Sequence, residues 1–387
     1  MRGTAAAGDD RPAVLIFRKR LLPWSETFIA AQGGALSRYR PVFVGYQCAG
    51  AGAHYLAGHD RVVLAEHARF PGLAKGALKA FGWVAPRWRG ELGARRPVLL
   101  HVHFGVNAAV ALPIARTFDL PLIVTYHGMD ITVERTTAAD RRRRERIFAA
   151  ADRIIAVSEF IAGRLREAGC PAEKLTVHYI GVDTERFVPA PAESRASSQI
   201  LFVGRLVPKK GLIHLIRAMP RVQRAVPDAE LVVAGDGGLR SQLEAEAGRL
   251  GIRCRFLGVR TPDQVQALMR RATLLCAPSV VAENGDAEGL GMVIVEAQAS
   301  GIPVVTFRSG GAAESVVHGE TGFVAPERDE DALAAHLTAI LADAELRDRM
   351  SAAARAHIVE NFDLRRQTAA LERIYDQVRG QATPLPL

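Results

Sequence analysis

The feature that most constrains this chain is the repeated alternation of short apolar runs with segments of helical length. Each run is apolar almost throughout, which is typical of strands in parallel sheets that helices cover on both faces. The sequence therefore predicts an α/β fold built from doubly wound parallel sheets. The runs lie at 13–17, 41–46, 98–104, 122–127, 153–158 and 175–180, and then at 200–206, 230–237, 254–258, 274–279, 302–307 and 322–326.

Eleven or twelve strands are too many for one compact sheet of this kind, so the 387 residues are predicted to form two Rossmann-like domains. The stretch 188–199 is rich in Pro, Ala and Ser, which is linker composition. An N-terminal domain is expected at 1–187 and a C-terminal domain at 200–362, followed at 363–387 by a helix that crosses back to the first domain. Open α/β sheets bind ligands beyond the carboxyl ends of their strands, so the site is expected there, in a cleft between the domains.

The net charge of +9 is concentrated in the first half, in RKR at 18–20, RWR at 87–89 and RRRRER at 141–146. A basic balance suits nucleic acid, anionic lipid or phosphorylated substrates. RKRLLPW and FGWVAPRWRG mix Arg with aromatic residues, a pattern that suits an anionic membrane surface. A solvated helix face explains RRRRER equally well. Nucleic acid is not expected as a partner, because no recognised binding motif accompanies the charge.

Nothing in the sequence predicts secretion or a membrane span. The first residues, MRGTAAAGDDRP, lack the apolar core of a signal peptide, and no apolar run reaches the roughly 18 residues of a span. The four cysteines have neither metal-ligand nor redox spacing. We therefore expect a cytoplasmic protein with inert thiols, peripheral at the inner face of the plasma membrane if it meets lipid.

A basic turn, GRLVPKKG, follows the first strand of the second half. The guanidinium of Arg205 and the ammonium of Lys210 at a strand's carboxyl end would suit a diphosphate, aided by the start of the next helix. The stretch is not a GxxxxGK[ST] loop, which argues against ATP hydrolysis. A solvated basic turn remains an equal explanation. Gly235, after the next strand, permits either close approach of a ligand or a tight turn.

The stretch NGDAEGLGMVIVE carries two carboxylates, Glu288 and Glu296. We expect Glu288 just before a helix whose first turn is formed by Gly289, Leu290 and Gly291, with amides free to donate to an anion or to sugar hydroxyls. A helix advances about 100° per residue, so the two carboxylates do not share one stripe. They suit two readers of sugar hydroxyls better than an acid–base pair. The alternative is a helix-start carboxylate and a surface glutamate.

In the first half, His127 directly follows a strand and could bind a substrate hydroxyl, although a buried or capping histidine is an equal explanation. The loop LLPWSETF precedes a helix that Ser25 or Thr27 could cap, with Glu26 in its first turn. Contact with an acceptor substrate suits the same loop. The candidate acceptor residues are Ser25, Glu26, Thr27, His103 and Asp130.

These motifs occur in order at strand ends, and together with SE at 158–159 and GVDTERF at 181–187 they resemble the retaining family-4 glycosyltransferases, which have the GT-B fold. The resemblance runs from about residue 13 to 365. Glu288 and Glu296 match the E-x7-E motif of that family. SETFI resembles a subgroup that makes exopolysaccharide and other surface glycans. One departure is that LLPWSETF replaces the Gly-Gly loop found after the first strand in many members.

The resemblance implies a role for each matching residue. Arg205 and Lys210 would bind the donor diphosphate and Glu296 the ribose, while His127 and Glu288, with the amides after it, would hold the donor sugar. The base would lie near Val259 and Arg260. The implied catalytic residues are His127, Arg205, Lys210 and Glu288; the implied donor-binding residues are Arg205, Lys210, Gly235, Val259, Arg260, Glu288, Gly289, Leu290, Gly291 and Glu296.

The implied activity is transfer of a hexosyl unit, with retention, from a UDP- or GDP-sugar to a glycan or lipid-linked saccharide in exopolysaccharide or cell-surface polysaccharide biosynthesis. No cofactor or metal is implied besides the donor substrate. Three alternatives stay open: a soluble secondary-metabolite acceptor, a sugar-nucleotide epimerase of GT-B fold, and a non-catalytic binding subunit.

Overall fold

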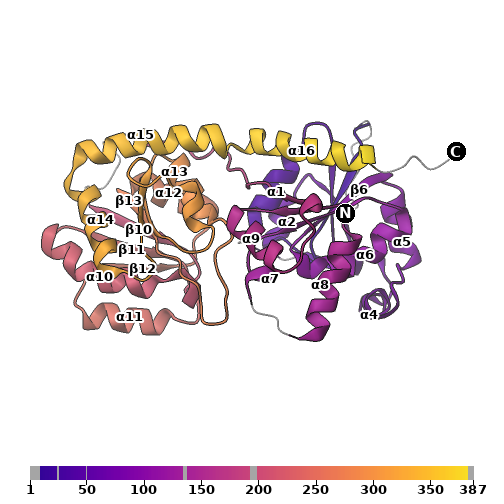
Figure 1. Ribbon diagram of the computed structural model, residues 1–387, viewed down its shortest axis with the longest axis horizontal. Helices are drawn as coiled ribbons and strands as arrows, with labels where there is room; N and C mark the ends of the chain where they lie inside the picture. Colours follow the sequence, from indigo (N-terminus) through magenta and orange to yellow (C-terminus); the bar gives the residue numbers. More distant parts are fainter. Residues whose placement is uncertain (1–8, 24–25, 49, 134–136, 192–197, 382–387) are drawn as a thin grey trace. The chain divides into compact units, whose positions relative to one another are not determined.

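The computed structural model describes residues 9–23, 26–48, 50–133, 137–191 and 198–381. The chain forms two compact units (Figure 1). One unit takes in the residues up to 181, apart from 132–134, and the chain from 364 onward; the other takes in 132–134 and 182–363. The division precedes the segment predicted as a linker, because Val182 pairs with Asp363 in a β-bridge and the hydroxyl of Thr184 donates to the Asp363 carboxylate. Residues 192–197 of that segment lie outside the described residues.

The N-terminal unit contains a parallel seven-stranded sheet in the order β5-β3-β1-β6-β7-β8-β9. Six of these strands match predicted runs. The edge strand β5 was missed, since it is short and begins with two charged residues. The strands are β1 (Ala13–Phe17), β3 (Arg40–Gly45), β5 (Asp60–Val63), β6 (Pro97–His103), β7 (Leu122–Tyr126), β8 (Arg153–Ala156) and β9 (Leu175–Val177), with β2 (Arg20–Leu21) and β4 (Gln47–Cys48) forming a separate two-stranded sheet.

Helices connect these strands, and apolar side chains from both make the core, among them Ile16, Phe43, Leu99 and Ile123. The helices are α1 (Thr27–Gly34), α2 (Gly50–Tyr55), α3 (Leu64–His67), α4 (Pro71–Phe81), α5 (Pro86–Gly93), α6 (Gly105–Phe118), α7 (Met129–Thr132), α8 (Ala138–Ala150), α9 (Glu159–Glu167) and α16 (Leu364–Gln381).

The last helix, α16, is fixed to the N-terminal unit by buried polar contacts. The Glu372 carboxylate, 1% exposed, accepts from the backbone N–H groups of Ser37 and Arg38 at 2.8 and 2.7 Å. The Tyr375 hydroxyl lies 2.7 Å from Nδ1 of the buried His101. Because a buried carboxylate is costly unless it is hydrogen-bonded, these contacts specify where α16 docks.

The C-terminal unit contains a parallel six-stranded sheet in the order β12-β11-β10-β13-β14-β15. All six strands match predicted runs. They are β10 (Gln199–Val203), β11 (Glu230–Ala234), β12 (Cys254–Gly258), β13 (Leu274–Ala277), β14 (Val304–Phe307) and β15 (Gly322–Ala325). The helices are α10 (Leu212–Ala225), α11 (Arg240–Arg249), α12 (Pro262–Arg271), α13 (Met292–Ala299), α14 (Glu330–Ala342) and α15 (Ala344–Asn361).

Both sheets share one topology, which confirms the predicted doubly wound α/β class with two Rossmann-like domains. In each, the first strand lies inside the sheet, successive strands extend to one edge, and the chain then crosses to the other side. The order therefore reverses between β1 and β6 and between β10 and β13. Such reversal points open a crevice at the strands' carboxyl ends, where ligands of this fold bind.

Candidate functional site

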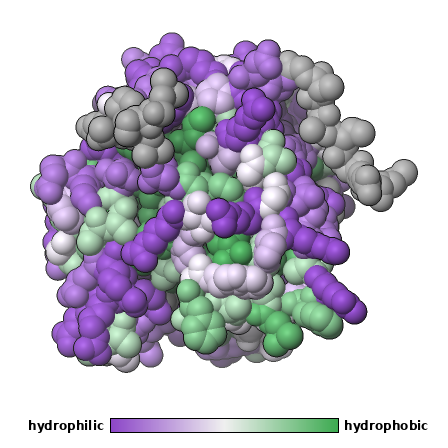
Figure 2. Space-filling view, turned by 90° about the vertical axis from the view of Figure 1, so that its right-hand side faces the viewer, coloured by the Kyte–Doolittle hydropathy of each residue, from purple (hydrophilic) through white to green (hydrophobic). Residues whose placement is uncertain are grey.

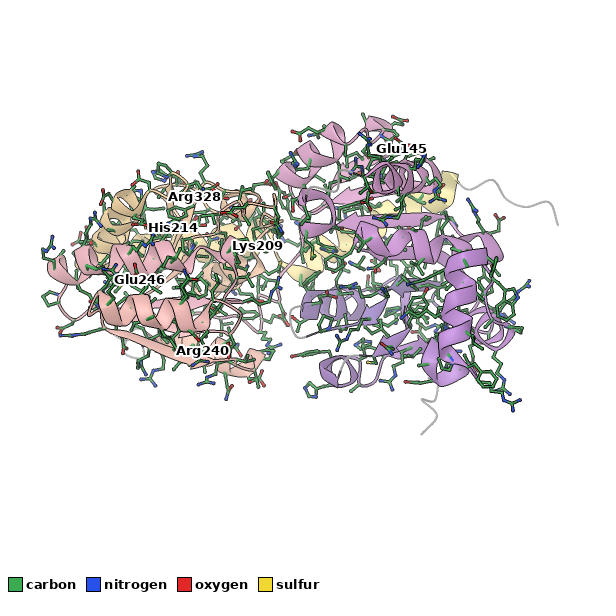
Figure 3. All side chains as sticks on the ribbon, turned by 90° about the horizontal axis from the view of Figure 1, so that it is seen from below. Glu145, Lys209, His214, Arg240, Glu246 and Arg328 are labelled. Atoms are coloured by element: carbon green, nitrogen blue, oxygen red, sulfur yellow. The ribbon has the colours of Figure 1, made fainter. Side chains whose placement is uncertain are left out.

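In the C-terminal unit, the loops after β10 and β13 bring cations and carboxylates together at the reversal point. Nζ of Lys210 lies 2.6 Å from Oε2 of Glu288, and the two side chains are 17% exposed each. Nζ of the neighbouring Lys209, labelled in Figure 3, lies 3.0 Å from Oδ1 of Asp286. The predicted basic turn and carboxylate stretch are thus in direct contact.

Gly211 makes this contact sterically feasible. Its φ is +63°, a conformation that side chains with a Cβ rarely adopt. A Cβ at this position would lie 1.8 Å from the carbonyl oxygen of Pro278, in the loop after β13. A larger residue would therefore push the turn that carries Lys210 away from Glu288.

Positive charge exceeds negative charge in this cluster. Burial alone would raise the pKa of Glu288, but Lys210, Lys209 and Arg205 together lower it to about 2. Glu288 is consequently ionised at physiological pH and holds no proton to donate. Arg205 is exposed, and among the described residues none forms an ion pair with it. Its guanidinium is available to an anionic ligand.

Glu296 has the opposite electrostatic state. It lies on α13, half-buried, and burial raises its pKa to about 7, while the charge of Arg186 opposes the shift. No side chain within the described ranges donates a hydrogen bond to its carboxyl group. A carboxyl with a pKa near neutrality and unused oxygens is ready to accept from a ligand's hydroxyls.

The predicted start of the helix after Glu288 was wrong. Gly291 adopts φ +76° as the N-cap of α13, so the helix begins at Met292. Gly289, Leu290 and Gly291 precede it and do not form its first turn, because a left-handed backbone cannot continue a right-handed helix. They still lead directly into the helix N-terminus.

The other predicted donor contacts lie nearer the sheet's edge. Gly235, at φ +150°, donates its N–H to the carbonyl of Gly258 at 2.9 Å, and a Cβ there would lie 1.9 Å from the Gly204 carbonyl. The protein's own backbone therefore accounts for this glycine. Val259 is 66% exposed and follows the edge strand β12, and Arg260 donates to its carbonyl at 3.0 Å.

In the N-terminal unit, His127 follows β7 in an aromatic enclosure. Its Nε2 lies 3.0 Å from Nδ1 of His103, and the two rings stack. The ring centres of Phe104 and Phe28 lie 4.5 and 5.1 Å from the centre of the His127 ring. Burial, with smaller effects of His101 and Arg18, lowers the pKa of His127 to about 3, so the ring is neutral. Its Nδ1 is buried without a hydrogen-bond partner among the residues that the structure describes.

Asp130 supports the His127 turn. Its Oδ1 accepts from the N–H groups of His127 and Gly128 at 3.0 and 2.9 Å, and its Oδ2 accepts from Gly105 N–H at 2.8 Å. Burial raises its pKa, although these backbone donors favour the ionised form. Both oxygens are committed to the protein itself, which makes Asp130 a positioning residue and argues against direct acceptor binding.

The loop after β1 holds an ion pair that sequence reasoning missed. Nη2 and Nε of Arg18 lie 2.6 and 2.7 Å from the two carboxylate oxygens of Glu26, and the guanidinium lies over the Phe104 ring at 4.4 Å. The predictions that Thr27 caps this helix and that Glu26 lies in its first turn were wrong. Thr27 is the first residue of α1, and Glu26 occupies the N-cap position without a side-chain capping bond. Ser25 lies outside the described residues. The sequence carried one signal for the ion pair, because Arg18 directly follows a strand.

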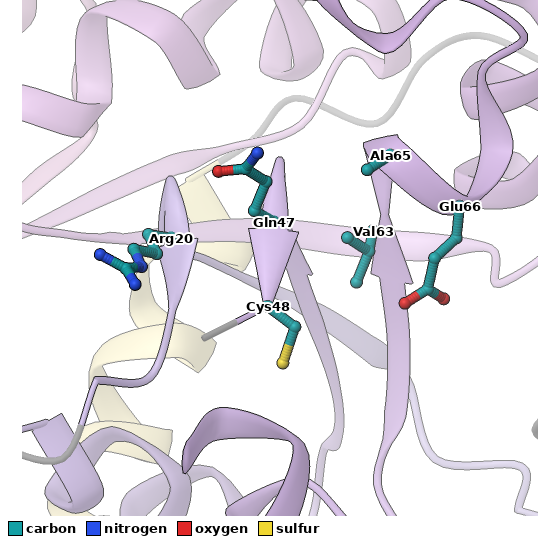
Figure 4. A pocket seen from close by; sticks show the side chains of 6 residues that line it. All are labelled: Arg20, Gln47, Cys48, Val63, Ala65 and Glu66. Carbon is teal, nitrogen blue, oxygen red and sulfur yellow. The ribbon is translucent and has the colours of Figure 1, made fainter. Parts of the chain in front are cut away.

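A separate hollow of about 370 Å³ lies in the N-terminal unit (Figure 4). Burial raises the pKa of its Cys48 thiol, which disfavours a reactive thiolate. Of the predicted site residues that the structure describes, none lines it. Its lining residues are Arg20, Gln47, Cys48, Val63, Ala65 and Glu66.

Comparison with known families and structures agrees with this geometry. Residues 183–357 match the family described as "Glycosyl transferases group 1", and residues 31–186 match "Glycosyltransferase Family 4". The chain has the fold of the Anabaena protein Alr3699/HepE, solved in complex with UDP and glucose, with a TM-score of 0.77 and 22% identity over 95% of this chain and 100% of that one.

Two curated relatives are similar in sequence. A "GDP-mannose-dependent alpha-(1-6)-phosphatidylinositol monomannoside mannosyltransferase" of Mycolicibacterium smegmatis is 34% identical over 70% of this chain and 75% of its own length. The "Putative colanic acid biosynthesis glycosyltransferase WcaL" of Escherichia coli is 33% identical over 61% of this chain and 60% of its own length. The chain therefore belongs to the family-4 glycosyltransferases of GT-B fold.

Proposed function

We propose that this glycosyltransferase moves a hexosyl unit from a UDP- or GDP-sugar to a hydroxyl of a glycan or lipid-linked saccharide, with retention of anomeric configuration. The observation that carries the proposal is the cluster of Arg205, Lys210 and Glu288 at the reversal point between β10 and β13. The relatives support both donor classes, since one is named as GDP-mannose-dependent and the Anabaena protein was solved with UDP.

Surface-polysaccharide biosynthesis is the pathway we favour. Two of the similar curated proteins are named for colanic acid and amylovoran biosynthesis. The enzyme would act in the cytoplasm, on an acceptor presented at the inner face of the plasma membrane.

Each polar group near β10 and β13 takes a part of the donor. Arg205 and Lys210 bind the diphosphate, because a forked guanidinium and a point charge suit its oxygens. Glu288, held in place by Lys210, accepts from hydroxyls of the donor sugar. Glu296 accepts from the ribose hydroxyls, and the loop at Val259 and Arg260 lies beside the base.

The chemical step breaks the bond between the anomeric carbon and the diphosphate oxygen, through an oxocarbenium-like state. Negative charge then grows on the diphosphate, where Arg205 and Lys210 stabilise it more than in the ground state. The acceptor hydroxyl attacks from the face that the diphosphate leaves, its oxygen bonds to the anomeric carbon, and its proton passes to the departing phosphate. Glu288 does not serve as the proton donor, because its pKa of about 2 keeps it ionised.

In the N-terminal unit, we assign sugar contacts to His127 and to the loop after β1. His127 is neutral and has one nitrogen without a partner among the described residues, so it offers a single uncharged hydrogen bond to a sugar hydroxyl. His103 fixes the orientation of that ring through the contact at 3.0 Å. Glu26, locked by Arg18, lies in the loop that we assign to the acceptor.

The ribose assignment of Glu296 predicts how nucleotide affinity depends on pH. Its carboxylate accepts two hydroxyl hydrogen bonds best when ionised, and its pKa is about 7. Between pH 6 and 8 the ionised fraction rises by roughly tenfold, so the affinity for UDP or GDP contributed by this group should rise accordingly. At pH 8, Glu296→Gln should bind UDP or GDP at least about tenfold more weakly than the wild type, as measured by isothermal titration calorimetry.

Glu296→Gln is also its own control for titration of the nucleotide phosphate, because that contribution persists in the variant.

In the free protein, the effect of pH on stability has the opposite sign. The folded pKa of about 7 exceeds the ordinary 4.5, so stability from protonated Glu296 is full below about 4.5 and lost as pH rises through 7. The melting temperature of Glu296→Gln should therefore exceed that of the wild type by a larger margin at pH 8 than at pH 5. Equal nucleotide affinity in both proteins at pH 8 would rule out the assignment.

A further inference from the structure

The helix α4 and its flanks expose bulky apolar side chains to solvent. Four side chains, Phe70, Leu73, Phe81 and Trp83, are 60%, 74%, 85% and 50% exposed. Eight large apolar side chains among the described residues are at least 36% exposed, and half of them fall within this short segment. Figure 2 shows apolar surface at the lower edge of the corresponding face of the N-terminal unit. We call these four residues the α4 patch.

Packing against the rest of the unit explains the buried residues of this segment, but it does not explain the exposed α4 patch. Ala74 and Leu78, one turn apart, are the buried residues of α4 and pack inward. Gly82, at φ +67°, ends the helix and donates its N–H to the Leu78 carbonyl, which brings Trp83 next to the helix end. The outward side chains contribute nothing to this core. Exposing them costs free energy in water unless a partner covers them.

The patch lies in a segment without acidic residues. From residue 68 to 90 the chain has five basic residues and no Asp or Glu; they are Arg69, Lys75, Lys79, Arg87 and Arg89. The Arg69 guanidinium lies 5.4 Å from the centre of the Phe70 ring, so charge and apolar surface are directly adjacent. After the larger effect of burial, Lys79 and Lys75 lower the pKa of Lys19, so both cations lie near that residue.

We propose that the α4 patch inserts into the headgroup region of an anionic lipid bilayer, with Arg69, Lys75 and Lys79 contacting lipid phosphates. Apolar and aromatic anchors beside cations, in a segment that carries no carboxylate of its own, are the composition of interfacial helices. Protein–protein interfaces are depleted in lysine, which argues against a protein as the occupant. Among the described helices, none is long and apolar enough to span a membrane. The inference does not depend on the identity of the donor.

The basic run on α8 offers an internal contrast. Arg141 and Arg142 are exposed in the same unit, but the apolar residues of that helix, Ile147 and Phe148, are buried. Charge is present there without anchors. If charge alone drew the protein to lipid, α8 would serve as well as α4.

Sedimentation of the full chain with vesicles tests the proposal. At low salt the protein should bind vesicles containing about one third phosphatidylglycerol but not pure phosphatidylcholine, and the binding should weaken as salt rises. Leu73→Ser/Phe81→Ser and Lys75→Glu/Lys79→Glu should each lower the partition coefficient by about tenfold or more. The controls Val359→Ser, an apolar exposed site on α15, and Arg141→Glu/Arg142→Glu should stay within about twofold of wild type.

Three outcomes would overturn the proposal: no binding to either vesicle, anionic binding that survives both α4 double substitutions, or binding lost equally in the α8 control. A concentration-dependent dimer that Leu73→Ser/Phe81→Ser dissociates, without vesicle binding, would assign the patch to self-association instead. Donor hydrolysis in vesicle-free solution should be unchanged in all these variants, so failure here leaves the transfer chemistry untouched.

Discussion

Lys210→Ala is expected to lower the turnover of sugar transfer by about a hundredfold or more, while the protein stays folded. The substitution removes one of the two cations that we assign to the leaving diphosphate. It also deprives the Glu288 carboxylate of its partner at 2.6 Å, so the group that we assign to the donor sugar loses its position. Turnover at saturating donor, with melting temperature measured in parallel, separates this effect from unfolding.

A matched lysine provides the control for this result. Lys79 is exposed on α4 in the other unit, so Lys79→Ala should leave donor hydrolysis in solution unchanged. Glu288→Gln keeps the shape of the side chain but loses the charge that pairs with Lys210. If the two residues act as one unit, the turnover of the double variant Lys210→Ala/Glu288→Gln should be little lower than that of Lys210→Ala alone. Turnover of folded Lys210→Ala within about threefold of wild type would contradict the assignment of this lysine.

Glu372→Ala is expected to destabilise the N-terminal unit by about 2–4 kcal/mol, because it removes the buried acceptor that docks α16 and leaves backbone donors unsatisfied. Four donors lose this acceptor: the N–H groups of Ser37 and Arg38, the Ser37 hydroxyl and Nε of Arg38, whose guanidinium keeps its ion pair with Asp376. For a unit of this size the melting temperature of its transition should fall by roughly 10 °C in a calorimetric scan.

The exposed Glu360, on α15, supplies the comparison, and Glu360→Ala should melt with the wild type. Limited proteolysis gives a second readout, since α16 should be cleaved earlier in Glu372→Ala. An unchanged melting temperature together with unchanged cleavage would show that α16 docks without this carboxylate.

The strands were predictable because burial on both faces makes each one apolar throughout. The edge strand β5 was not, because Asp60 and Arg61 begin it and only its second half is buried. The start of α13 was misplaced, because the sequence does not show that Gly291 takes a left-handed conformation. The contact of Lys210 with Glu288 was not predicted, although it follows from the two loops meeting where the strand order reverses.

Other features depend on tertiary packing that no local pattern carries. Glu296 and Glu288 look alike in the sequence, but one is half-buried without a partner among the described residues and the other is surrounded by cations. Their pKa values consequently move in opposite directions. Glu372 has the sequence context of a surface residue, although it is 1% exposed. The pairing of Arg18 with Glu26 likewise required the structure.

The most direct test of the central claim is to incubate the protein with a panel of UDP- and GDP-sugars and to follow each donor by phosphorus and proton NMR. We predict slow hydrolysis of at least one donor, which releases free nucleoside diphosphate, and its loss in Lys210→Ala. With a saccharide acceptor, the first product should keep the anomeric configuration of the donor. A folded protein that neither binds nor consumes any donor of the panel, or a product of inverted configuration, would contradict the account.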